Sequence, residues 1–579
     1  MIFFLISLFF IVMRKLLSIF RILLYTFIFV GIFNSLNARV LEFNSDAKSI
    51  SNYFSGLISF DNFEYQTSES FFKKIKGFEG KNKKYSSRLI QSYVNLQNYD
   101  EAYKYSKSLE KSNESNFESN LFLGLYEFKN NNYDKASFYF KRLKTKGNKD
   151  RFFEILESSL NVWPKISESK KKEDIKLLNY ANKSFESLQI IESTFAHCFL
   201  ETVDAEKKLI SLFNNEQYNF SRYNFFVSNY FFNKNKLDES KKLINSAHEK
   251  YPGNLLIHQF KKVLNNNEKN NNVFNCKNSS HIMAEIFYIL SNILSSEREY
   301  KLSNFFISLS KFLNPNFHSY NTLLAENYIV LERYETAEVI YKKLFKAGSV
   351  YKWYSAKQIA SIMEEKNNDT ALKYISDIYK TLKNPGIYET FDLANFHRNN
   401  ESYKESINLY SKILLKINKK HNLYPEILER RGMAYERNNK WELGEKDLIE
   451  SLKVKPNEPY VMNYLAYSWI EQNTNIDQAL EMLKQANDLK KNNGYITDSL
   501  GWALYKTKNF SEAKKYLEIA MMLLPRDPII NDHYADCLWM NNHKIQARYY
   551  WNNVLKSDKA EDELKSKVEK KMLFGLENI

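Results

Sequence analysis

Small and apolar residues recur at a fixed interval along the carboxyl-terminal part of the chain. The dipeptides Leu465-Ala466, Leu500-Gly501 and Tyr534-Ala535 lie 35 and then 34 residues apart. Similar offsets lead to a second small residue and then a large apolar one in each copy: Ala479 and Leu483, Ala513 and Leu517, Ala547 and Trp551. A period near 34 residues is typical of arrays of helical hairpins. The pattern therefore predicts one antiparallel pair of helices per copy.

The middle copy shows how such a pair is built. Leu500, Gly501 and Leu504 share one face of a first predicted helix, and Ala513, Leu517 and Ala520 line a second one after a turn at Lys508-Asn509. Pro525 ends the second helix, because proline cannot continue it. Gly501 and Ala513 are small where the two helices approach closely, so a larger side chain there would cost roughly 1–3 kcal/mol.

This spacing of small, large and proline positions resembles the tetratricopeptide repeat (TPR). The stretch from Tyr495 to Trp502, followed by Pro528 to His533, is similar to secreted TPR proteins of bacterial cell envelopes. The resemblance implies an all-α fold, a TPR-type α-solenoid in which helix–turn–helix repeats form a right-handed superhelix. It implies no defined activity.

The same register extends towards the amino terminus. The small residues are spaced by 34, 35, 34, 38, 34, 35 and 34 residues: Ser291, Ala325, Ala360, Ala394, Gly432, Ala466, Gly501 and Ala535. A longer turn around 419–424 accounts for the 38. Five prolines fall between the predicted helices: Pro315, Pro385, Pro425, Pro456 and Pro525.

These signals divide the chain into five parts. Residues 39–264 form amino-terminal, partly degenerate TPR-like repeats, whose register fades between 151 and 219. Residues 265–280 are Asn-rich and predict a linker or loop, and 281–556 form the regular array. In 557–579, Leu564, Val568 and Met572 share one face of a charged segment, which predicts a closing helix. A helix that docks a partner is the alternative for that segment.

Residues 1–38 predict a signal peptide or a membrane anchor. Basic residues separate a first apolar stretch from the apolar run Ile22–Phe33, which is about twelve residues long and shorter than the roughly 20 that a spanning helix needs. Cleavage after Ala38 gives an exported protein, and retention gives an anchored one. Translation from Met13 would give a leader of ordinary length. Each alternative predicts a body in the periplasm or cell envelope.

Composition narrows the class of protein further. A chain of 579 residues is too long for one compact hydrophobic core, but an array of repeats is not limited in this way, because each repeat contacts only its neighbours. A content of 44% hydrophobic and 26% charged residues is typical of a folded chain. The formal charge is +15, yet the lysines are scattered among Asn, Tyr, Phe and Ile, so we expect no nucleic-acid binding. Mild attraction to an anionic surface, and membrane association through the amino-terminal apolar segment, stay open.

The three cysteines, Cys198, Cys276 and Cys537, are far apart and odd in number. We interpret them as small buried hydrophobic residues and not as a disulfide framework.

No motif of catalysis is present. The zinc-protease, phosphate-loop, serine-hydrolase and dinucleotide patterns are missing, and only 14 glycines are available for phosphate-binding loops. The nearest approach to a metal site is Asp532, His533, Asp536 and Cys537, but its two i, i+4 pairs point to different helix faces. Helix capping by Asn531 or Asp532 and packing of Cys537 explain these residues better, as packing explains His397. We predict no enzyme activity, no metal and no cofactor.

In the TPR family the first helix of each repeat lines the concave face, where ligands lie. Transferring that register predicts nine partner-binding residues: Tyr460, Asn463, Tyr467, Asp498, Trp502, Tyr505, Asp532, Asp536 and Trp539. Aromatic rings beside carboxylates suit an extended peptide, although packing between repeats is the alternative for Trp502 and Tyr505. The Lys/Asn/Arg clamp of some TPR co-chaperones is absent, because Phe391, Glu429 and Met433 occupy its positions.

The sequence therefore predicts a non-enzymatic TPR scaffold of the bacterial cell envelope that binds proteins or peptides on its concave face. One alternative is the TPR accessory arm of an envelope enzyme complex, whose catalytic module would have to lie in 151–219 or elsewhere in the amino-terminal half. Another is a cytoplasmic regulatory TPR protein, which requires an inert leader.

Overall fold

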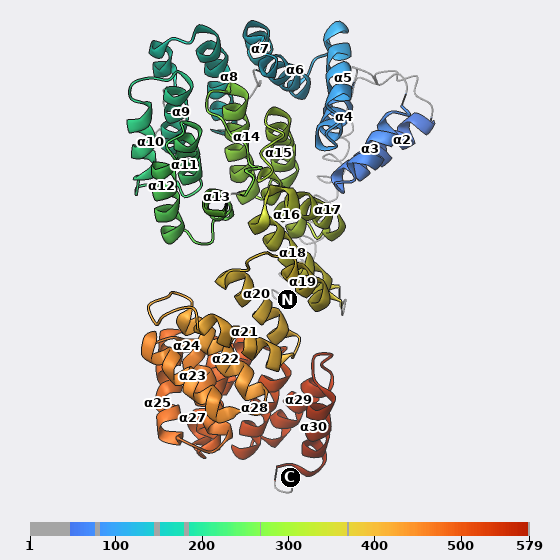
Figure 1. The fold of residues 1–579 in the computed structure, drawn as a ribbon. Coiled ribbons are helices and arrows are strands. Elements are labelled where there is room, and N and C mark those ends of the chain that lie inside the picture. The colour runs from blue at the N-terminus through green and yellow to red at the C-terminus, as the bar shows by residue number, and fades with distance from the viewer. Residues whose placement is uncertain are drawn as a thin grey trace, which may run out of the picture. The chain divides into compact units, whose positions relative to one another are not determined.

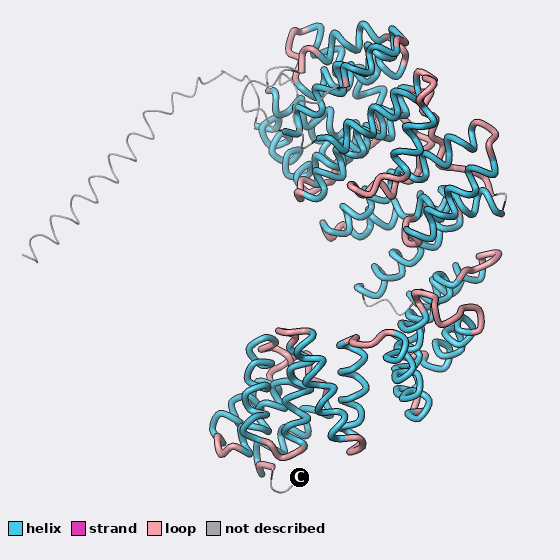
Figure 2. The backbone as a smooth tube through the Cα atoms, turned by 90° about the vertical axis from the view of Figure 1, so that its left-hand side faces the viewer, coloured by secondary structure: helices cyan, strands magenta, loops and turns pink. Residues whose placement is uncertain are grey.

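A computed structural model describes residues 47–75, 82–143, 151–178, 185–266, 268–366 and 370–576. The predicted signal peptide or anchor, 1–38, lies outside these ranges. The described residues form helices and connecting turns, with one isolated bridge between Asn272 and Phe317 (Figure 2). None of the helices in these ranges has the length and apolar character needed to cross a membrane.

The chain divides into two compact units, Met1–Lys352 (unit 1) and Trp353–Ile579 (unit 2). The helices of unit 1 are α2 (Ala47–Asp61), α3 (Tyr65–Phe72), α4 (Lys83–Asn95), α5 (Tyr99–Lys111), α6 (Phe117–Lys129), α7 (Tyr133–Phe140), α8 (Arg151–Ser169), η1 (Lys172–Leu177), α9 (Glu186–Phe199), α10 (Ala205–Phe213), α11 (Tyr223–Asn233), α12 (Leu237–Lys250), α13 (Leu255–Asn266), α14 (Ser279–Ser296), α15 (Tyr300–Leu313), α16 (Tyr320–Val330), α17 (Tyr334–Leu344) and η3 (Phe345–Ala347) (Figure 1).

Helix α18 (Ser349–Glu365) spans the boundary. Unit 2 continues with α19 (Ala371–Lys380), α20 (Ile387–Asn399), α21 (Tyr403–Leu414), α22 (Tyr424–Arg437), α23 (Trp441–Val454), α24 (Pro459–Glu471), α25 (Ile476–Leu489), α26 (Gly494–Lys506), α27 (Phe510–Leu523), α28 (Pro528–Met540), α29 (Lys544–Leu555) and α30 (Asp562–Phe574). The predicted all-α array of helical hairpins is confirmed.

The predicted register coincides with the helix pairs. All eight small residues from Ser291 to Ala535 lie in the first helix of a pair, here called the A helix, and are buried against the second, the B helix. In unit 2, α20, α22, α24, α26 and α28 are A helices. Pro425 occupies the first turn of α22, where a proline loses no hydrogen bond. Pro164, in contrast, lies inside α8.

The turns between A and B helices share one backbone feature. Two residues beyond the end of each A helix in unit 2, the chain adopts a left-handed conformation: Glu401, Asn439, Asn473, Lys508 and Asn542, with φ between 55° and 64°. Asparagine tolerates this region better than most residues do, and it commonly ends helices there. Part of the chain's asparagine content therefore serves its hairpin turns.

The close contact between the A and B helices of a pair explains why glycine occupies some of the repeated small positions. A Cβ atom on Gly444 of α23 would lie 2.7 Å from the carbonyl oxygen of Gly432 in α22, and a Cβ on Gly432 would lie 3.0 Å from that of Gly444. A Cβ on Gly501 would lie 2.6 Å from Cγ of Leu517. The backbones of paired helices therefore meet where the sequence has its smallest side chains.

Unit 1 does not follow the rule that each repeat contacts only its neighbours. The hairpin α14–α15 packs against α4, α6, α8 and α9, which lie far earlier in the chain. Tyr99 donates a hydrogen bond to the Ser308 carbonyl at 3.0 Å, and the Phe312 ring lies 4.8 Å from the Tyr99 ring and 5.2 Å from that of Phe122. The early repeats of unit 1 are therefore held by the α14–α15 hairpin as well as by one another.

The Asn-rich segment, predicted as a linker or loop, is packed within unit 1. Asn272 is buried and accepts a hydrogen bond from Ser319 N at 3.0 Å, and Phe274 is 3% exposed. The boundary between the two units falls instead at Lys352–Trp353.

Cys276, at the end of this segment, forms a disulfide with Cys198 of α9, with Cα atoms 5.9 Å apart. The interpretation of all three cysteines as unpaired hydrophobic residues is therefore wrong for two of them, because folding brings together residues 78 positions apart in the chain. Cys537 is free and buried.

The contact between Gly432 and Gly444 yields a prediction with an unambiguous sign. Alanine in place of glycine inside a helix ordinarily stabilises by roughly 1 kcal/mol. Gly444→Ala should instead lower the free energy of unfolding, because overpacking against a backbone carbonyl costs about 1–3 kcal/mol. Gly253→Ala is the control, since nothing lies within 4 Å of its added Cβ, and it should change stability by less than about 0.5 kcal/mol. Urea unfolding of both variants measures the two changes in stability. A Gly444→Ala variant that is more stable than the wild type would contradict the close approach of α22 and α23.

Candidate functional site

Three A helices of unit 2 lie side by side, because α24 contacts α26 and α26 contacts α28. We call the surface formed by α24, α26 and α28 the A-helix face. All nine predicted partner-binding residues belong to α24, α26 and α28.

Exposed apolar side chains occupy the same register position in three successive A helices. Tyr460, Tyr495 and Ile529 each lie six residues before the small residue of their repeat, and they are 50%, 59% and 53% exposed. Contiguous apolar surface often marks a binding site. We call these three residues the apolar row.

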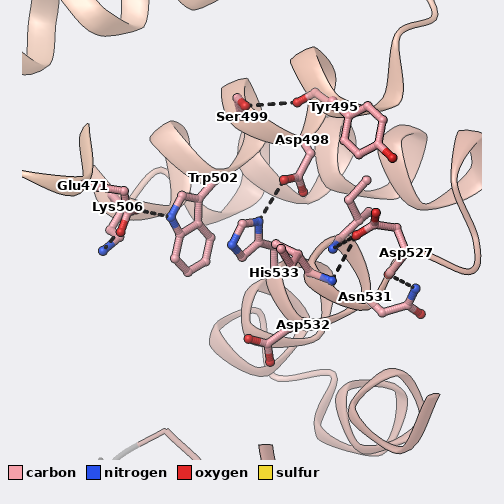
Figure 3. A network of polar contacts seen from close by, with 12 residues as sticks. Glu471, Tyr495, Asp498, Ser499, Trp502, Lys506, Asp527, Asn531, Asp532 and His533 are labelled. Atoms are coloured by element: carbon pink, nitrogen blue, oxygen red, sulfur yellow. Dashed lines mark hydrogen bonds and ion pairs between the residues drawn. The ribbon is translucent and has the colours of Figure 1, made fainter. Parts of the chain in front are cut away.

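Trp502 lies beside this row within a stack of rings. Its indole is parallel to the His533 imidazole, with centroids 3.9 Å apart, and to the Tyr505 ring at 4.7 Å. The indole Nε1 donates a hydrogen bond to Glu471 at 2.7 Å, and the Lys506 ammonium lies 5.3 Å from the ring centroid. The orientation of Trp502 is therefore fixed by three different helices (Figure 3).

Asp498 and His533 form a buried polar pair in the same place (Figure 3). Asp498 Oδ2 lies 2.9 Å from His533 Nδ1, and both residues are at most 7% exposed. Burial opposes the charged imidazolium, but the charge of Asp498 and its hydrogen bond outweigh burial and raise the pKa of His533 above its ordinary value. The other oxygen of Asp498 is buried without a hydrogen-bond partner in the described part of the chain.

Asp532 and Asp536 are occupied by a lysine from α30. The Lys571 ammonium lies 2.8 Å from Asp532 and 2.7 Å from Asp536, and Asp536 also accepts a hydrogen bond from Trp551 Nε1 at 2.9 Å. Burial and the nearby charge of Asp532 raise the pKa of the Asp536 carboxyl to about 6, although Lys571 opposes the shift. Helix α30 thus covers the end of the A-helix face.

The nine predicted residues therefore fall into two sets. Five are partly accessible or exposed: Tyr460, Asn463, Tyr467, Trp502 and Tyr505. Four are buried within the fold: Asp498, Asp532, Asp536 and Trp539. Burial, with the charges of Glu471 and Asp498 adding to it, raises the pKa of Tyr467 well above its ordinary value, so its phenol stays neutral. The accessible set concentrates on α24 and α26.

Several residues of this site were not predicted. Glu471 and Lys506 orient Trp502, while His533 and Lys571 pair with buried carboxylates. Two of these contacts join residues one repeat apart, since Asp498–His533 and Asp536–Lys571 both span 35 positions. Charged residues of opposite sign at that separation are the signal that could have found them.

The described residues hold no group of three or more His, Cys, Asp or Glu side chains arranged to bind a metal ion. Asp532, His533, Asp536 and Cys537 form no such group: Lys571 pairs with both Asp532 and Asp536, and His533 pairs with Asp498. Cys537 donates to the Phe510 carbonyl, and burial raises the pKa of its thiol to about 12, so the thiol stays protonated. Asp527, and not Asn531 or Asp532, caps α28, accepting from Ile529 N and Ile530 N.

Comparison with known proteins adds a sequence relative. No family model matches the chain. A stretch of 105 residues is 30% identical to the TPR repeat-containing protein PA4667 of Pseudomonas aeruginosa, and it covers 18% of each chain. The chain therefore matches less than a fifth of that relative's length.

Two solved structures illustrate the structural likeness. TTC0263, a thermophilic TPR protein in Thermus thermophilus, is 15% identical with a TM-score of 0.29; the match covers 32% of this chain and all of that one. MamA from Desulfovibrio magneticus RS-1 is 14% identical with a TM-score of 0.27, covering 30% and 97%. Likeness at this level carries no argument about function.

The fold defines a class of helical-repeat proteins, the α-solenoids. Paired helices with a 34-residue period and small residues at the pair contact are the architecture of the tetratricopeptide repeat. The described part of the chain is a TPR-type α-solenoid.

The buried pair Asp498–His533 predicts a pH dependence of stability. The folded state raises the pKa of His533. The protonated His533 ring therefore contributes its full stabilisation below about pH 6.5, and this stabilisation is lost as pH rises through the folded-state pKa. The slope from this one proton is at most about 1.4 kcal/mol per pH unit. Urea unfolding between pH 6 and 9 should show that His533→Gln flattens the profile. His421→Gln, whose ring accepts a hydrogen bond from Leu423 N in a surface turn, should leave it unchanged; equal profiles for wild type and His533→Gln would refute the assignment.

Proposed function

We propose that this protein is a non-enzymatic scaffold that binds an extended segment of a partner protein along the A-helix face of unit 2. The observation that carries the proposal is the apolar row, Tyr460, Tyr495 and Ile529, which stays exposed in three successive repeats. Packed helices lie about 8–10 Å apart. Three neighbouring A helices therefore place the row along roughly 16–20 Å, the length of about six residues of extended chain.

The neighbouring residues supply polar contacts beside the row. Glu471 and Lys506 are both exposed and lie at the Trp502 ring, and they form an ion pair with each other at 3.6 Å. This exposed pair gives a partner backbone or side chain a carboxylate and an ammonium to contact. Tyr467 adds a neutral phenol in the same region. Aromatic surface with a few fixed polar groups is the usual composition of a peptide site.

Helix α30 limits how far a partner can extend. Lys571 already neutralises Asp532 and Asp536, and Trp539 is 7% exposed. We therefore place the partner on α24 and α26 and on the exposed start of α28, and assign the buried carboxylates to the packing of the repeats. This narrows the nine predicted residues to the accessible five, together with Tyr495 and Ile529.

We further propose that the protein resides in the periplasm or cell envelope of a bacterium. Two features support this location. Residues 1–38 have the pattern of a leader or anchor, and a disulfide joins Cys198 to Cys276, a bond that is rare in the reducing cytosol. The relative in Pseudomonas aeruginosa is bacterial.

Photocrosslinking tests the binding face. A benzophenone amino acid at position 495 should capture a polypeptide in cells, because Tyr495 is exposed within the apolar row. Position 522 is the matched control: Met522 is 66% exposed but belongs to the B helix of the same repeat. Ile529→Ala should reduce capture from position 495 by roughly three- to tenfold, as expected for about 1 kcal/mol of lost apolar contact. Equal capture from positions 495 and 522 would exclude the A-helix face as the binding surface.

Location is tested separately with a reporter that is active only outside the cytoplasm, fused after Ala38. We expect activity from this fusion, and none when Ile22–Phe33 is deleted. An inactive fusion, with the reporter produced but retained in the cytoplasm, would overturn the envelope assignment and leave the proposed binding face untouched.

A further inference from the structure

The Asn-rich segment 268–278, here called the strap, is fixed along its length. Glu268 accepts hydrogen bonds from Gln259 at 2.9 Å and Ser349 at 3.0 Å at one end. In the middle, Val273 N donates to the Asn316 carbonyl at 3.1 Å. The Cys198–Cys276 disulfide holds the other end. The strap is therefore a rigid wall and not a loose connection.

A cavity of about 190 Å³ lies between the strap and helices α9, α10 and α11. Four buried apolar side chains line it, Phe195, Leu209, Phe226 and Phe274, each at most 3% exposed, and the rest of the lining is largely polar. Asn229 closes one side and donates to the Phe274 carbonyl at 2.8 Å, which fixes the strap against α11. An apolar cavity of about 150 Å³ in another protein accommodates benzene, so this one has room for a ring or a branched chain.

The solvent side of the cavity carries positive charge. Lys234 and Lys277 line it, with side chains 37% and 48% exposed, and both approach one oxygen of Glu201, at 3.1 and 2.6 Å. Hydrogen bonds from Lys277 and Lys234 hold the pKa of the Glu201 carboxyl below its ordinary value, so it stays ionised. The neighbouring pair Lys236–Glu206 is neutral overall. Two lysines against one carboxylate leave a net charge of about +1 at the mouth.

We propose that unit 1 binds a small organic acid here, with an aromatic or branched apolar body inside the cavity and its carboxylate at Lys234 and Lys277. The apolar interior selects the body, and the uncompensated lysine charge selects the anion. The same chemistry exists at the carboxyl terminus of a peptide, but the volume of about 190 Å³ favours a free acid. This site lies in unit 1 and does not depend on the A-helix face of unit 2.

Ligand-observed NMR titration of the full chain tests the proposal with 3-phenylpropionate as the probe. We expect saturable binding, and binding at least about fivefold weaker for the neutral 3-phenylpropionamide. N-acetyl-Ala-Ala-Phe, which presents the same ring and carboxylate on a peptide, should bind more weakly than the free acid. Tighter binding of the peptide than of the acid would overturn the assignment to a small acid.

Substitutions of the charged residues at the mouth should change the affinity for 3-phenylpropionate in opposite directions. Glu201→Gln should tighten the binding of 3-phenylpropionate by about two- to fivefold, because it removes the carboxylate that competes for both lysines, and Lys277→Ala should weaken it by a similar factor. Lys236→Ala is the matched control, since that lysine pairs with Glu206 and does not line the cavity; it should leave the affinity unchanged. Leu209→Trp fills the cavity and should abolish binding, with circular dichroism confirming the fold. Binding that is insensitive to Glu201→Gln, Lys277→Ala and Leu209→Trp would show an unspecific interaction and overturn the proposal.

Discussion

The contact between the two helices of a repeat is the interaction on which the rest of the molecule depends. It brings backbones together at Gly432 and Gly444, and it seats Leu517 on Gly501. Side chains larger than these would push the helices apart. Because every repeat closes at the same position, successive A helices come to lie beside one another, and the apolar row follows from that alignment. The A-helix face is thus a consequence of packing between small residues on the opposite side of the same helices.

Buried charge is the second constraint, and it determines which part of the face is available. Isolated carboxylates are costly inside a protein, so Asp498, Asp532 and Asp536 require hydrogen-bonded or charged partners. His533 of α28 pairs with Asp498, and Lys571 of α30 pairs with Asp532 and Asp536. The same contacts hold adjacent repeats together and remove these carboxylates from the surface. What remains exposed on α24, α26 and the start of α28 is apolar and aromatic, flanked by Glu471 and Lys506.

The periodic part of the fold could be predicted, because small and large residues repeat at the contact that builds each hairpin. The eight small residues from Ser291 to Ala535 all proved to lie in A helices. Non-periodic contacts could not be predicted in this way. The disulfide, the strap and the packing of α14–α15 against α4 join residues with no fixed separation. For the site, the repeat register placed the nine residues on A helices. It could not show that Asp536 is buried while Tyr467 is partly accessible, because the burial of Asp536 depends on whether a later helix carries a lysine such as Lys571.

Hydrogen exchange after Leu517→Ala tests the dependence of the structure on helix-pair contacts most directly. Leu517 is fully buried against Gly501, and its truncation should cost about 2–5 kcal/mol. If contacts within and between neighbouring repeats hold unit 2 together, amide protection should fall in α26–α29 and stay at wild-type levels in α2–α7 of unit 1. An equal loss of protection along the whole chain would contradict this, because it would mean that the protein unfolds as one cooperative body.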